Sequence, residues 1–473
     1  MASPRASEDL LIIGFDAEWV LSADKNSRHI LSYQYAGRCA KGEWSGIIYT
    51  KGLSKKDRIR FVDLIGKAIA DGRKRQILPN KWPSSIYAAA HFSRADLSAF
   101  KDFSKLNVEF DNVQKTFSTI GNKPYVRRYT DKSNNQHEFK IHLIDTMLLT
   151  PNKYGLEALG DLYDFQKIKL PEGMIEKMDQ LLIDDPALFE EYAIRDAEIA
   201  ALHAWEMTKF ARDTFGTKKP PTTIGSLAVS HLNSLWSQAG INSDAVLGEE
   251  TKPEKTWNSK NHKYITKPKT VLIASAHDHQ NLATEAYHGG RSEAYVFGFS
   301  KIDLWTDFDL QGAYTTAMAA IKVPDYQNFR TSRKVADYRP SNLGFARISF
   351  VFPDDTRFPC LPVRTNHGLI FPLQGESYVA SPEIALAINM GAKIKIKHGV
   401  IFPWKNNVRP YEHFSKDIRE KRTTCKKGSL QERLWKEIGN SLYGKTAQGL
   451  RDKRLFDSRS GATKRLGRSE VTN

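Results

Sequence analysis

The stretch LLIIGFDAEWV, from Leu10 to Val20, restricts the possible folds of this chain more than any other. Its β-branched and aromatic residues predict a strand, in which alternate side chains point to opposite faces. Asp16 and Glu18 would therefore leave the same face of that strand. Two such carboxylates are commonly no more than solvated charges, so their meaning depends on which other residues the fold brings to them.

The runs that follow predict a mixed α/β domain. Strand-like segments divided by glycine and polar turns cover residues 28–37 and 43–50. Apolar residues at helical spacing mark residues 57–75, and strand character returns at 85–93. Strands that alternate with helices in this way are typical of α/β folds. Further expected elements are a strand over 137–149, a long amphipathic helix over 185–211 and a loop from Gly216 to Thr223. Later in the chain, strands are expected over 291–299, 302–310, 344–353 and 392–402.

Acidic and aromatic residues recur along this first part of the chain. Asp96 lies in HFSRADLSAF, and Asp145 lies in HLIDTMLL. Tyr192 and Asp196 follow in YAIRD, one helical turn apart on one face of the expected long helix. A carboxylate pair on a strand, a later aspartate and a tyrosine–aspartate pair on a helix form an ordered set.

This set resembles the proofreading 3′-5′ exonuclease domain of the DEDD type, which has an RNase H-like fold. The resemblance implies that four carboxylates hold two Mg²⁺ (or Mn²⁺) ions and that Tyr192 orients the attacking water. Hard divalent cations prefer carboxylate oxygens, and a charge-dense metal pair suits phosphodiester hydrolysis. The implied metal ligands are Asp16, Glu18, Asp96 and Asp196.

Other residues near this set have alternative interpretations. Before Asp96 the chain departs from the family, since Phe92 and Ala95 replace an asparagine and an aromatic residue. Asp145 is expected to be structural or to support a metal ligand. Lys167, in FQKIKLP, matches the place where protein-primed DNA polymerases carry a lysine that assists the exonuclease. A solvated loop lysine is the alternative.

The stretch KEIGNSLYGK, near the end of the chain, carries a second kind of pattern. On a helix, Lys436, Asn440 and Tyr443 or Gly444 would share one face. A lysine there can pair with triphosphate oxygens, a tyrosine can stack beside a base pair, and a glycine lets the template come close. The stretch resembles the second polymerase motif of family-B DNA polymerases. The alternative is an amphipathic helix with a C-terminal glycine cap.

WTDFDLQGAYTTAM reads as a strand that runs into a helix, and it resembles the first palm motif of the same family. The resemblance places Asp309 at a metal-binding position and Tyr314 as the aromatic that excludes a ribose 2′-hydroxyl. The match is loose because Gly312, Ala313 and Thr315 replace the usual serine, leucine and proline. A strand end with a buried tyrosine is the alternative.

Between these parts lies AYHGGRSEAYVFG, which matches the Tyr-x-Gly-Gly motif of protein-primed family-B polymerases at Tyr287, Gly289 and Gly290. That motif contacts the template strand in the family, so the resemblance implies DNA binding here. Arg291, beside two glycines that expose the backbone, is a candidate phosphate contact. A plain β-turn is the alternative.

The order of these motifs, from Asp16 to Gly444, resembles protein-primed family-B DNA polymerases of phages, linear plasmids and mobile elements. The resemblance implies an α/β (α+β) chain in which an RNase H-like exonuclease domain is followed by a partial palm and helical fingers. It also implies transfer of nucleotides from dNTPs to DNA with two divalent ions. The expected domains are an exonuclease domain (1–212), a linker and template-binding region (213–300), a partial palm (301–410), and fingers with the end of the palm (411–473).

The charge of the chain favours a polyanionic partner. It has 70 Lys and Arg against 54 Asp and Glu, a net charge of +16, and residues 416–473 alone hold 16 basic and 7 acidic residues. Arg422 and Lys426 are four apart on an expected basic helix, and the resemblance implies that they help to hold the triphosphate. A solvated helix face is the alternative. Residues 251–269 read as a lysine-rich exposed insertion or linker. The expected partners are DNA and dNTPs, with a terminal protein or a second chain as further candidates.

No membrane segment or secretory signal is expected, and three distant cysteines suggest neither disulfides nor zinc. We therefore expect a cytoplasmic protein of a bacterial, virus-infected or plasmid-bearing cell.

The third palm motif of the family, an Asp-Thr-Asp on a hairpin after the fingers, supplies the second metal-binding carboxylate. After Gly444 the only acids are Asp452, Asp457 and Glu470, none in that setting. We therefore expect an N-terminal portion of a longer or split polymerase, competent as an exonuclease but not to polymerise alone. A stand-alone exonuclease and a catalytically inactive DNA-binding protein are the alternatives.

Overall fold

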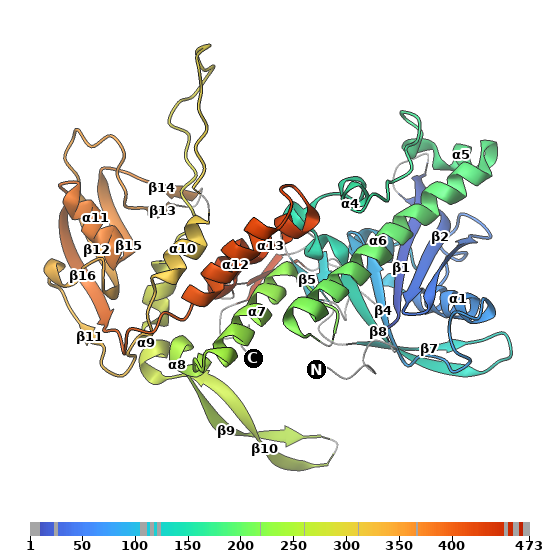
Figure 1. The fold of residues 1–473 in the computed structure, drawn as a ribbon, viewed down its shortest axis with the longest axis horizontal. Coiled ribbons are helices and arrows are strands. Elements are labelled where there is room, and N and C mark those ends of the chain that lie inside the picture. Colours follow the sequence, from blue (N-terminus) through green and yellow to red (C-terminus); the bar gives the residue numbers. More distant parts are fainter. Residues whose placement is uncertain are drawn as a thin grey trace. The chain divides into compact units, whose positions relative to one another are not determined.

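The chain divides into two compact units (Figure 1). The first comprises residues 1–230, 421–441 and 453–466, and the second comprises residues 231–420, 442–452 and 467–473. Helices α7 (Ile224–Gln238) and α13 (Leu430–Thr446) contribute residues to both. The expected division into four domains stays a prediction. The computed structural model describes residues 10–22, 27–104, 111–113, 118–120, 124–217, 219–259, 261–310, 312–365, 368–448, 453–456 and 463–466.

A six-stranded mixed sheet forms the centre of the first unit, in the order β3-β2-β1-β4-β8-β7. β1, β4 and β8 are parallel, whereas β2, β3 and β7 run antiparallel to their neighbours. The carboxyl ends of the three parallel strands therefore share one edge of the sheet. The strands are β1 (Ile12–Leu21), β2 (Arg28–Cys39), β3 (Gly42–Tyr49), β4 (Ser85–Ala90), β7 (Tyr125–Thr130) and β8 (Gln136–Asp145).

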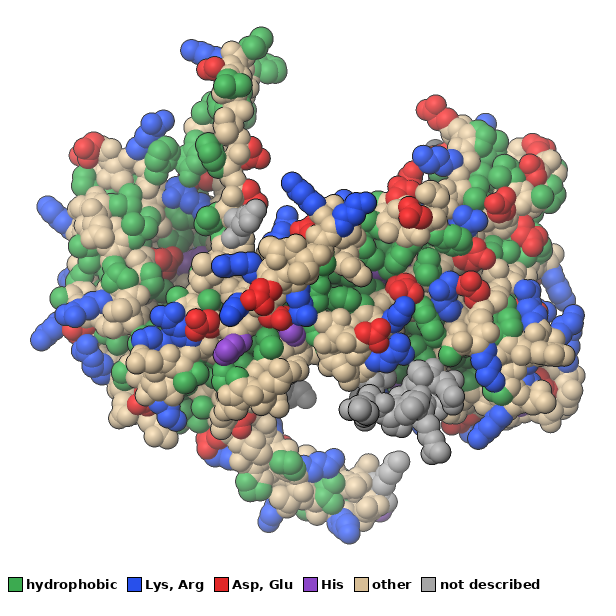
Figure 2. Space-filling model, in the orientation of Figure 1, with side chains coloured by type: hydrophobic (Ala, Val, Ile, Leu, Met, Phe, Trp, Pro, Cys, Tyr) green, Lys and Arg blue, Asp and Glu red, His purple; other side chains and the backbone are tan. Residues whose placement is uncertain are grey.

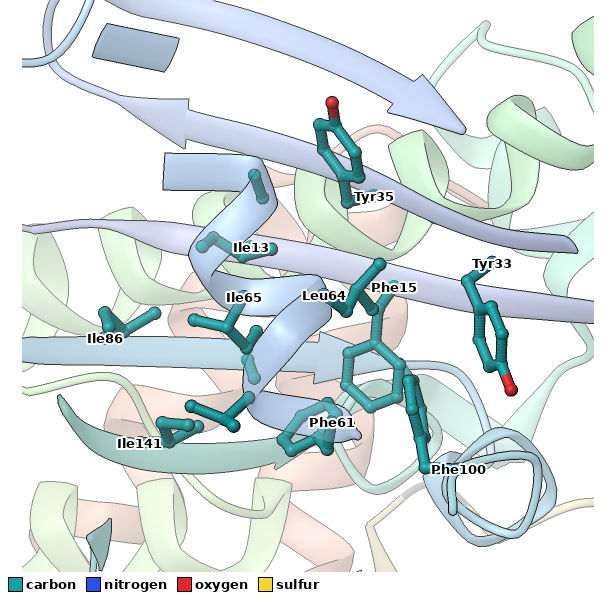
Figure 3. Packing of buried hydrophobic residues seen from close by; sticks show 14 of the residues in the cluster. Ile13, Phe15, Tyr33, Tyr35, Phe61, Leu64, Ile65, Ile86, Phe100 and Ile141 are labelled. Atoms are coloured by element: carbon teal, nitrogen blue, oxygen red, sulfur yellow. The ribbon is translucent and has the colours of Figure 1, made fainter. Parts of the chain in front are cut away.

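One face of this sheet packs against helix α1 (Phe61–Lys74) in the main hydrophobic core. Figure 3 shows Ile13 and Phe15 of β1 beside Phe61 and Ile65 of α1. The rings of Phe15 and Phe61 meet edge to face with centroids 5.0 Å apart. Burial of each such side chain contributes about 1.5–3 kcal/mol, so this face holds β1 in place.

The other face of β1 packs against helix α6 (Pro186–Phe215), which is 30 residues long. A Cβ added to Gly14 would lie 2.2 Å from the carbonyl oxygen of Ala197 and 2.8 Å from the Cβ of Ala201. Only glycine therefore permits this close approach of helix to strand. Because Asp16 and Asp196 neighbour these residues in the sequence, the same contact brings their side chains together.

Helix α6 has well-defined ends. The Asp185 side chain accepts a hydrogen bond of 3.0 Å from the backbone N–H of Leu188, and Pro186 occupies the first turn. Gly216 ends the helix in the left-handed conformation, with φ of +66°. The loop expected from Gly216 to Thr223 is confirmed, since α7 begins only at Ile224.

A four-stranded antiparallel sheet, in the order β11-β16-β12-β15, lies in the second unit. Helix α11 (Ser381–Asn389) contributes Ile384 to its core, where Ile348 and Phe350 of β12 are also buried. The strands expected over residues 344–353 and 392–402 are thereby confirmed. The strands are β11 (Arg330–Thr331), β12 (Leu343–Val351), β15 (Gln374–Ala380) and β16 (Lys393–Phe402).

Shorter elements complete the described chain. The helices are α2 (Ser93–Leu97), α4 (Leu156–Leu162), α5 (Met178–Asp184), α8 (Ser243–Leu247), α9 (Ala274–Glu285), α10 (Ala313–Ala319) and α12 (Glu412–Thr424). The 3-10 turns are η2 (Thr146–Leu149), η3 (Pro151–Lys153), η4 (Ile175–Lys177) and η5 (Val335–Asp337). The strands of two-stranded hairpins are β5 (Asp111–Val113), β6 (Ser118–Ile120), β9 (Glu249–Asn258), β10 (Lys263–Leu272), β13 (Val363–Thr365), β14 (Gly368–Ile370), β17 (Lys453–Phe456) and β18 (Thr463–Leu466).

Two local expectations differ from the structure. Residues 291–299 and 302–310 form no strand, and Phe297, Phe299 and Ile302 are fully exposed. A β-branched and aromatic run becomes a strand only when another strand pairs with it, and none among the described residues does so. Residues 251–269, which read as an insertion or linker, belong to the exposed hairpin of β9 and β10.

The expected mixed α/β fold class is confirmed. None of the helices in the described ranges is long and apolar enough to cross a membrane.

Candidate active site

Three carboxylates of the first unit converge beside the contact of β1 with α6. Asp16 and Glu18 project from β1 and Asp196 from α6, and their oxygens lie within 4.8 Å of one another. Between Glu18 and Trp19 the pairing of β1 with β2 shifts register, an irregularity of the kind that redirects side chains near active sites. Among the described residues, this is the only such group of three or more potential metal ligands.

Asp96 joins this group from the next parallel strand. It lies in α2, which follows β4 at the shared edge of the sheet, and its side chain is buried and hydrogen-bonded to that of Asp16. The turn before it is held by Asp145. The carboxylate of Asp145 accepts hydrogen bonds from Phe92 N at 3.1 Å and Ser93 Oγ at 3.0 Å, which gives it a structural role.

Lys167 lies against the helical part of the site. Its Nζ donates a hydrogen bond of 2.6 Å to Asp196 Oδ2 and lies 4.9 Å from the centre of the Tyr192 ring. Burial by itself lowers the pKa of Lys167, but Asp196 and Tyr192 together outweigh burial and raise it. The ammonium therefore stays charged and offsets part of the negative charge of the cluster.

Arg195 is a site residue that the sequence reasoning missed. Its Nη1 donates a hydrogen bond of 2.7 Å to the carbonyl oxygen of Gln166, and its guanidinium lies 4.2 Å from the centre of the Phe165 ring. These contacts fasten the loop that carries Lys167 to helix α6. Its place immediately before Asp196 in YAIRD was the only signal in the sequence.

Burial raises the pKa of every carboxyl in this cluster. The pKa of Asp196 rises to about 7, first because the group is buried and then because Asp16 carries like charge. Burial and neighbouring like charges also place the pKa values of Glu18 and Asp96 well above their usual range, whereas burial alone raises the pKa of Asp16. Four crowded acids of this kind favour either bound protons or a cation.

The donor set fits a divalent metal ion. Three carboxylates supply hard oxygen ligands on one side of the contact between strand and helix. Asp196 Oδ1 is buried and has no hydrogen-bond partner in the described chain, so one oxygen is left free to coordinate. Asp16, Glu18 and Asp196 are therefore the residues that would hold such an ion, with Asp96 beside them.

A second group, composed of tyrosines, forms in the second unit. The rings of Tyr314 and Tyr443 stack at 4.4 Å and 19°, and Tyr287 lies 5.8 Å from Tyr443. Tyr443 Oη also donates a hydrogen bond of 3.0 Å to the carbonyl oxygen of His288. A Cβ at Gly290 would lie 2.3 Å from Tyr314 Oη, so the glycine makes room for this ring. Three motifs that are distant in sequence thus meet.

A largely apolar cavity of about 520 Å³ adjoins these rings. Tyr287, Tyr314 and Tyr443 line one part of it, and Phe402 and Tyr411 line another. Because the lining carries few charges, it suits a flat apolar group better than a phosphate.

The other predicted DNA-binding residues are placed as follows. Gly289 is exposed and a Cβ added there would meet nothing within 4 Å, so no packing reason requires glycine at this position. Arg291 is occupied by protein groups: its Nε donates to Glu293 at 2.7 Å and its Nη1 to the carbonyl oxygen of Pro359 at 2.9 Å. Its role as a phosphate contact stays a prediction.

Asp309 is the predicted metal ligand of the second unit. It belongs to the exposed stretch between residues 291 and 310, which has no regular structure, and to no cluster of three potential ligands among the described residues. The expected strand before α10 is therefore wrong, whereas the expected helix after it is confirmed. Asp309 as a metal ligand stays a prediction. Asp452, Asp457 and Glu470 lie outside the described residues.

The predicted nucleotide-facing residues of α13 are accessible. Lys436, Asn440 and Gly444 are all exposed and are spaced by four residues within one helix. Arg422 forms an ion pair of 2.9 Å with Glu432, which joins α12 to α13. Because α12 ends at Thr424, Lys426 lies in the following turn and not on the same helix as Arg422, contrary to expectation.

Comparisons with known proteins agree with these patterns. Residues 222–471 match the family described as DNA polymerase type B, organellar and viral. The chain is 36% identical to the primer-independent DNA polymerase PolB of Escherichia coli, over 98% of its own length and 57% of that protein. It thus spans little more than half of this curated relative.

Solved structures of phi29 DNA polymerase have a similar fold. The complex with primer-template DNA and incoming nucleotides matches with a TM-score of 0.56 and 13% identity, over 97% of this chain and 72% of that one. The complex with single-stranded DNA matches with a TM-score of 0.54 and 12% identity over the same shares of the two chains. The family match covers more than half of the chain, so the chain belongs to the family of type B DNA polymerases, organellar and viral.

Proposed function

We propose that this chain is part of the machinery of a DNA-directed DNA polymerase and that its first unit is a 3′-5′ proofreading exonuclease. The observation that carries the exonuclease is the convergence of Asp16, Glu18 and Asp196 within 4.8 Å, with Asp96 hydrogen-bonded to Asp16. Membership of the type B family supports DNA and dNTPs as the substrates. A bacterial cytoplasm, as for the relative from Escherichia coli, is the proposed location.

The proposed cofactor is Mg²⁺ or Mn²⁺, with two ions per active site. When bound, such ions lower the pKa of water and stabilise the departing oxygen of a phosphodiester. Asp16, Glu18 and Asp196 would hold them, and Asp96 would complete the set. The chain's own contribution is to keep these groups dehydrated and close together, which strengthens every charge interaction among them.

Tyr192 and Lys167 are proposed to position the reaction. The Tyr192 hydroxyl has its pKa raised to about 12, mainly by burial, so it remains a hydrogen-bond donor that can orient water. Lys167 holds Asp196 by the contact of 2.6 Å and faces the Tyr192 ring. Arg195 in turn holds the loop of Lys167, so these residues act as one assembly on α6.

The second unit is proposed to bind the nucleotide and template. Tyr314 and Tyr443 stack on each other, and an aromatic pair of this kind can face a sugar and a base. Tyr287, Gly289, Gly290 and Arg291 would contact the template strand, and Asp309 would bind metal. The exposed residues Lys436, Asn440 and Gly444 of α13, together with Arg422 and Lys426, would face the triphosphate.

A nuclease assay tests the exonuclease. The purified chain is incubated with Mg²⁺ or Mn²⁺ and a 5′-labelled single-stranded oligonucleotide. We expect it to shorten the oligonucleotide from the 3′ end. Asp16→Ala combined with Glu18→Ala should reduce degradation to background. Glu191→Gln is the matched control, because Glu191 is exposed on α6 beside Tyr192. Absence of degradation by the wild type with either metal would leave DNA binding without catalysis as the better interpretation.

A primer-extension assay separates the polymerase from a stand-alone exonuclease. Asp309 belongs to no acidic cluster in the described chain, so we propose that this chain alone degrades primers but does not extend them. A second chain with further palm carboxylates would then be needed. Extension of a primed template by the chain with four dNTPs would contradict this proposal.

Two modes of priming are compatible with the family. The sequence favours a terminal protein, whereas the relative from Escherichia coli is named as primer-independent. We favour the second mode for the whole protein. Synthesis on single-stranded DNA without primer or terminal protein would support it.

A further inference from the structure

The hairpin of β9 and β10 is the strongest unexplained feature of the second unit. Its two strands pair along their whole length, from Glu249 opposite Leu272 to Asn258 opposite Lys263. Figure 1 shows it projecting from the end of α8. Most of its side chains are exposed, so they contribute little to a core.

The hairpin carries a net positive charge. Residues 249–272 contain six lysines and three glutamates; Glu249 and Glu250 lie at its base, and Glu254 pairs with Lys269 at 2.6 Å. Figure 2 shows lysine side chains along the hairpin at the bottom of the view. Such a density of positive charge on a narrow ribbon favours a polyanion over a neutral partner.

An exposed aromatic pair lies near the tip. Trp257 and Tyr264 are directly opposite in the ladder, 54% and 69% exposed, with ring centroids 5.1 Å apart. Lys255 and Thr266 follow on the same face of the ribbon, because residues two apart along a strand share a face. Large exposed aromatic residues beside lysines, with no core to join, are typical of a platform on which bases stack.

Each edge of the hairpin carries a proline. Pro253 and Pro268 are directly opposite each other, and neither has an N–H to donate. They therefore form a pair whose missing donors would have pointed outward, where an added strand would have paired. A proline on each edge disfavours pairing with a further β-strand, so the faces of the ribbon are the favoured binding surface.

We propose that the hairpin of β9 and β10 binds single-stranded DNA, with unpaired bases stacked on Trp257 and Tyr264 and phosphates contacted by Lys255 and its neighbours. Stacking tolerates any base, so the hairpin binds without sequence preference. The inference rests on the proposed action on DNA, but it concerns a surface that contains none of the predicted catalytic residues.

The test is binding of a labelled oligothymidylate to the full chain in EDTA, where metal-dependent degradation is stopped. Trp257→Ala with Tyr264→Ala should weaken binding about tenfold, and blunt duplex of equal length should be affected by less than about twofold. Thr256→Ala with Ile265→Ala is the matched control, since these residues are opposite each other on the other face. It should leave the affinity unchanged.

Two further variants distinguish the loss of DNA contacts from misfolding of the hairpin. Trp257→Phe should keep most of the affinity but lose the part of the fluorescence quenching that DNA causes in the wild type. Lys255→Glu should weaken binding and flatten its dependence on salt, because fewer counterions are released. Unchanged affinity in the aromatic variant, or an equal loss in the control pair, would overturn the inference. Because no catalysis is measured, an inactive exonuclease would not affect the result.

Discussion

The predicted metal ligands of the first unit and of the second unit differ in how well the surrounding structure holds them. Asp16, Glu18 and Asp196 come from a strand and a helix that pack directly on each other, and Asp96 reaches them from the next parallel strand. Asp309, by contrast, lies on an exposed stretch without regular structure. A motif thus becomes a site only where neighbouring elements hold its backbone, since a carboxylate on an unsupported segment has no fixed neighbours.

The aromatic residues near Asp309 behave differently from Asp309 itself. Tyr314 lies only five residues further on, but α10 holds it against Tyr443 in a stack of 4.4 Å. Asp309 therefore lies in an exposed segment without regular structure, whereas Tyr314 lies in a helix that packs against other residues. The predictions below test this difference between supported and unsupported residues.

The largest expected effect concerns the carboxylates themselves. Asp16→Asn should reduce degradation of single-stranded DNA by about 10³-fold, the scale for the loss of a central electrostatic group. Asp309→Asn should leave the same rate unchanged, because Asp309 shares no cluster with the first set. Rates of release of 3′-terminal nucleotides provide the measurement. Equal losses in the two variants would show that the sets act together.

The second prediction concerns the contact between β1 and α6, which brings Asp196 close to Asp16. Gly14→Val would force its side chain into Ala197 and Ala201 of α6, since even a Cβ has no room. We expect a loss of about 1–3 kcal/mol in the free energy of unfolding, together with slower degradation, because α6 carries Asp196. Chemical denaturation measures the first effect. Gly289→Ala is the control, as nothing lies within 4 Å of its added Cβ.

The third prediction uses pH. Burial lowers the pKa of His91 to about 4, and its ring nitrogens are hydrogen-bonded to Thr146 and to the carbonyl oxygen of Tyr154. A histidine whose pKa is lower in the folded state stabilises the fold above its unfolded pKa of about 6.5 and loses that contribution as the pH falls toward about 4. Between pH 6.5 and about 4, the free energy of unfolding of His91→Asn should therefore fall by about 1–3 kcal/mol less than that of the wild type.

Thermal unfolding at a series of pH values measures the difference. His262→Asn, at an exposed position on the turn of the hairpin, serves as the control and should follow the wild type. If the stability of the wild type and that of His91→Asn depend on pH in the same way, His91 is not the buried group whose protonation destabilises the fold.

The smallest expected effect is a gain in stability. Glu18 has its pKa raised well above the usual range by burial and by the charges of Asp16 and Asp196. Above pH 7 without divalent metal, Glu18→Gln removes a repelled charge and should raise the free energy of unfolding by about 1 kcal/mol. Adding Mg²⁺ should reverse the order, because the wild type alone retains the full set of ligands. If Glu18→Gln is less stable than the wild type in EDTA, repulsion between Glu18 and its acidic neighbours does not destabilise the site.

Much of the first site could be predicted from local sequence. The spacing of Asp16 and Glu18 predicted a shared strand face, and that of Tyr192 and Asp196 predicted a shared helix face. Arg195 was missed because its role depends on Gln166 and Phe165, which lie in a loop some distance earlier in the chain. Residues 291–299 and 302–310 were misread as strands because their composition predicts strand character but cannot supply a pairing partner.

The sequence by itself determined the family, the mixed α/β class and the identity of the acidic and aromatic residues, because these follow from residue types and their spacing. Only the tertiary structure decided which of them meet. Gly14 permits α6 to approach β1, and this brings Asp196 to Asp16. The stack of Tyr314 on Tyr443 joins motifs more than a hundred residues apart. Long-range contacts of this kind depend on packing between elements, which no local pattern of residues contains.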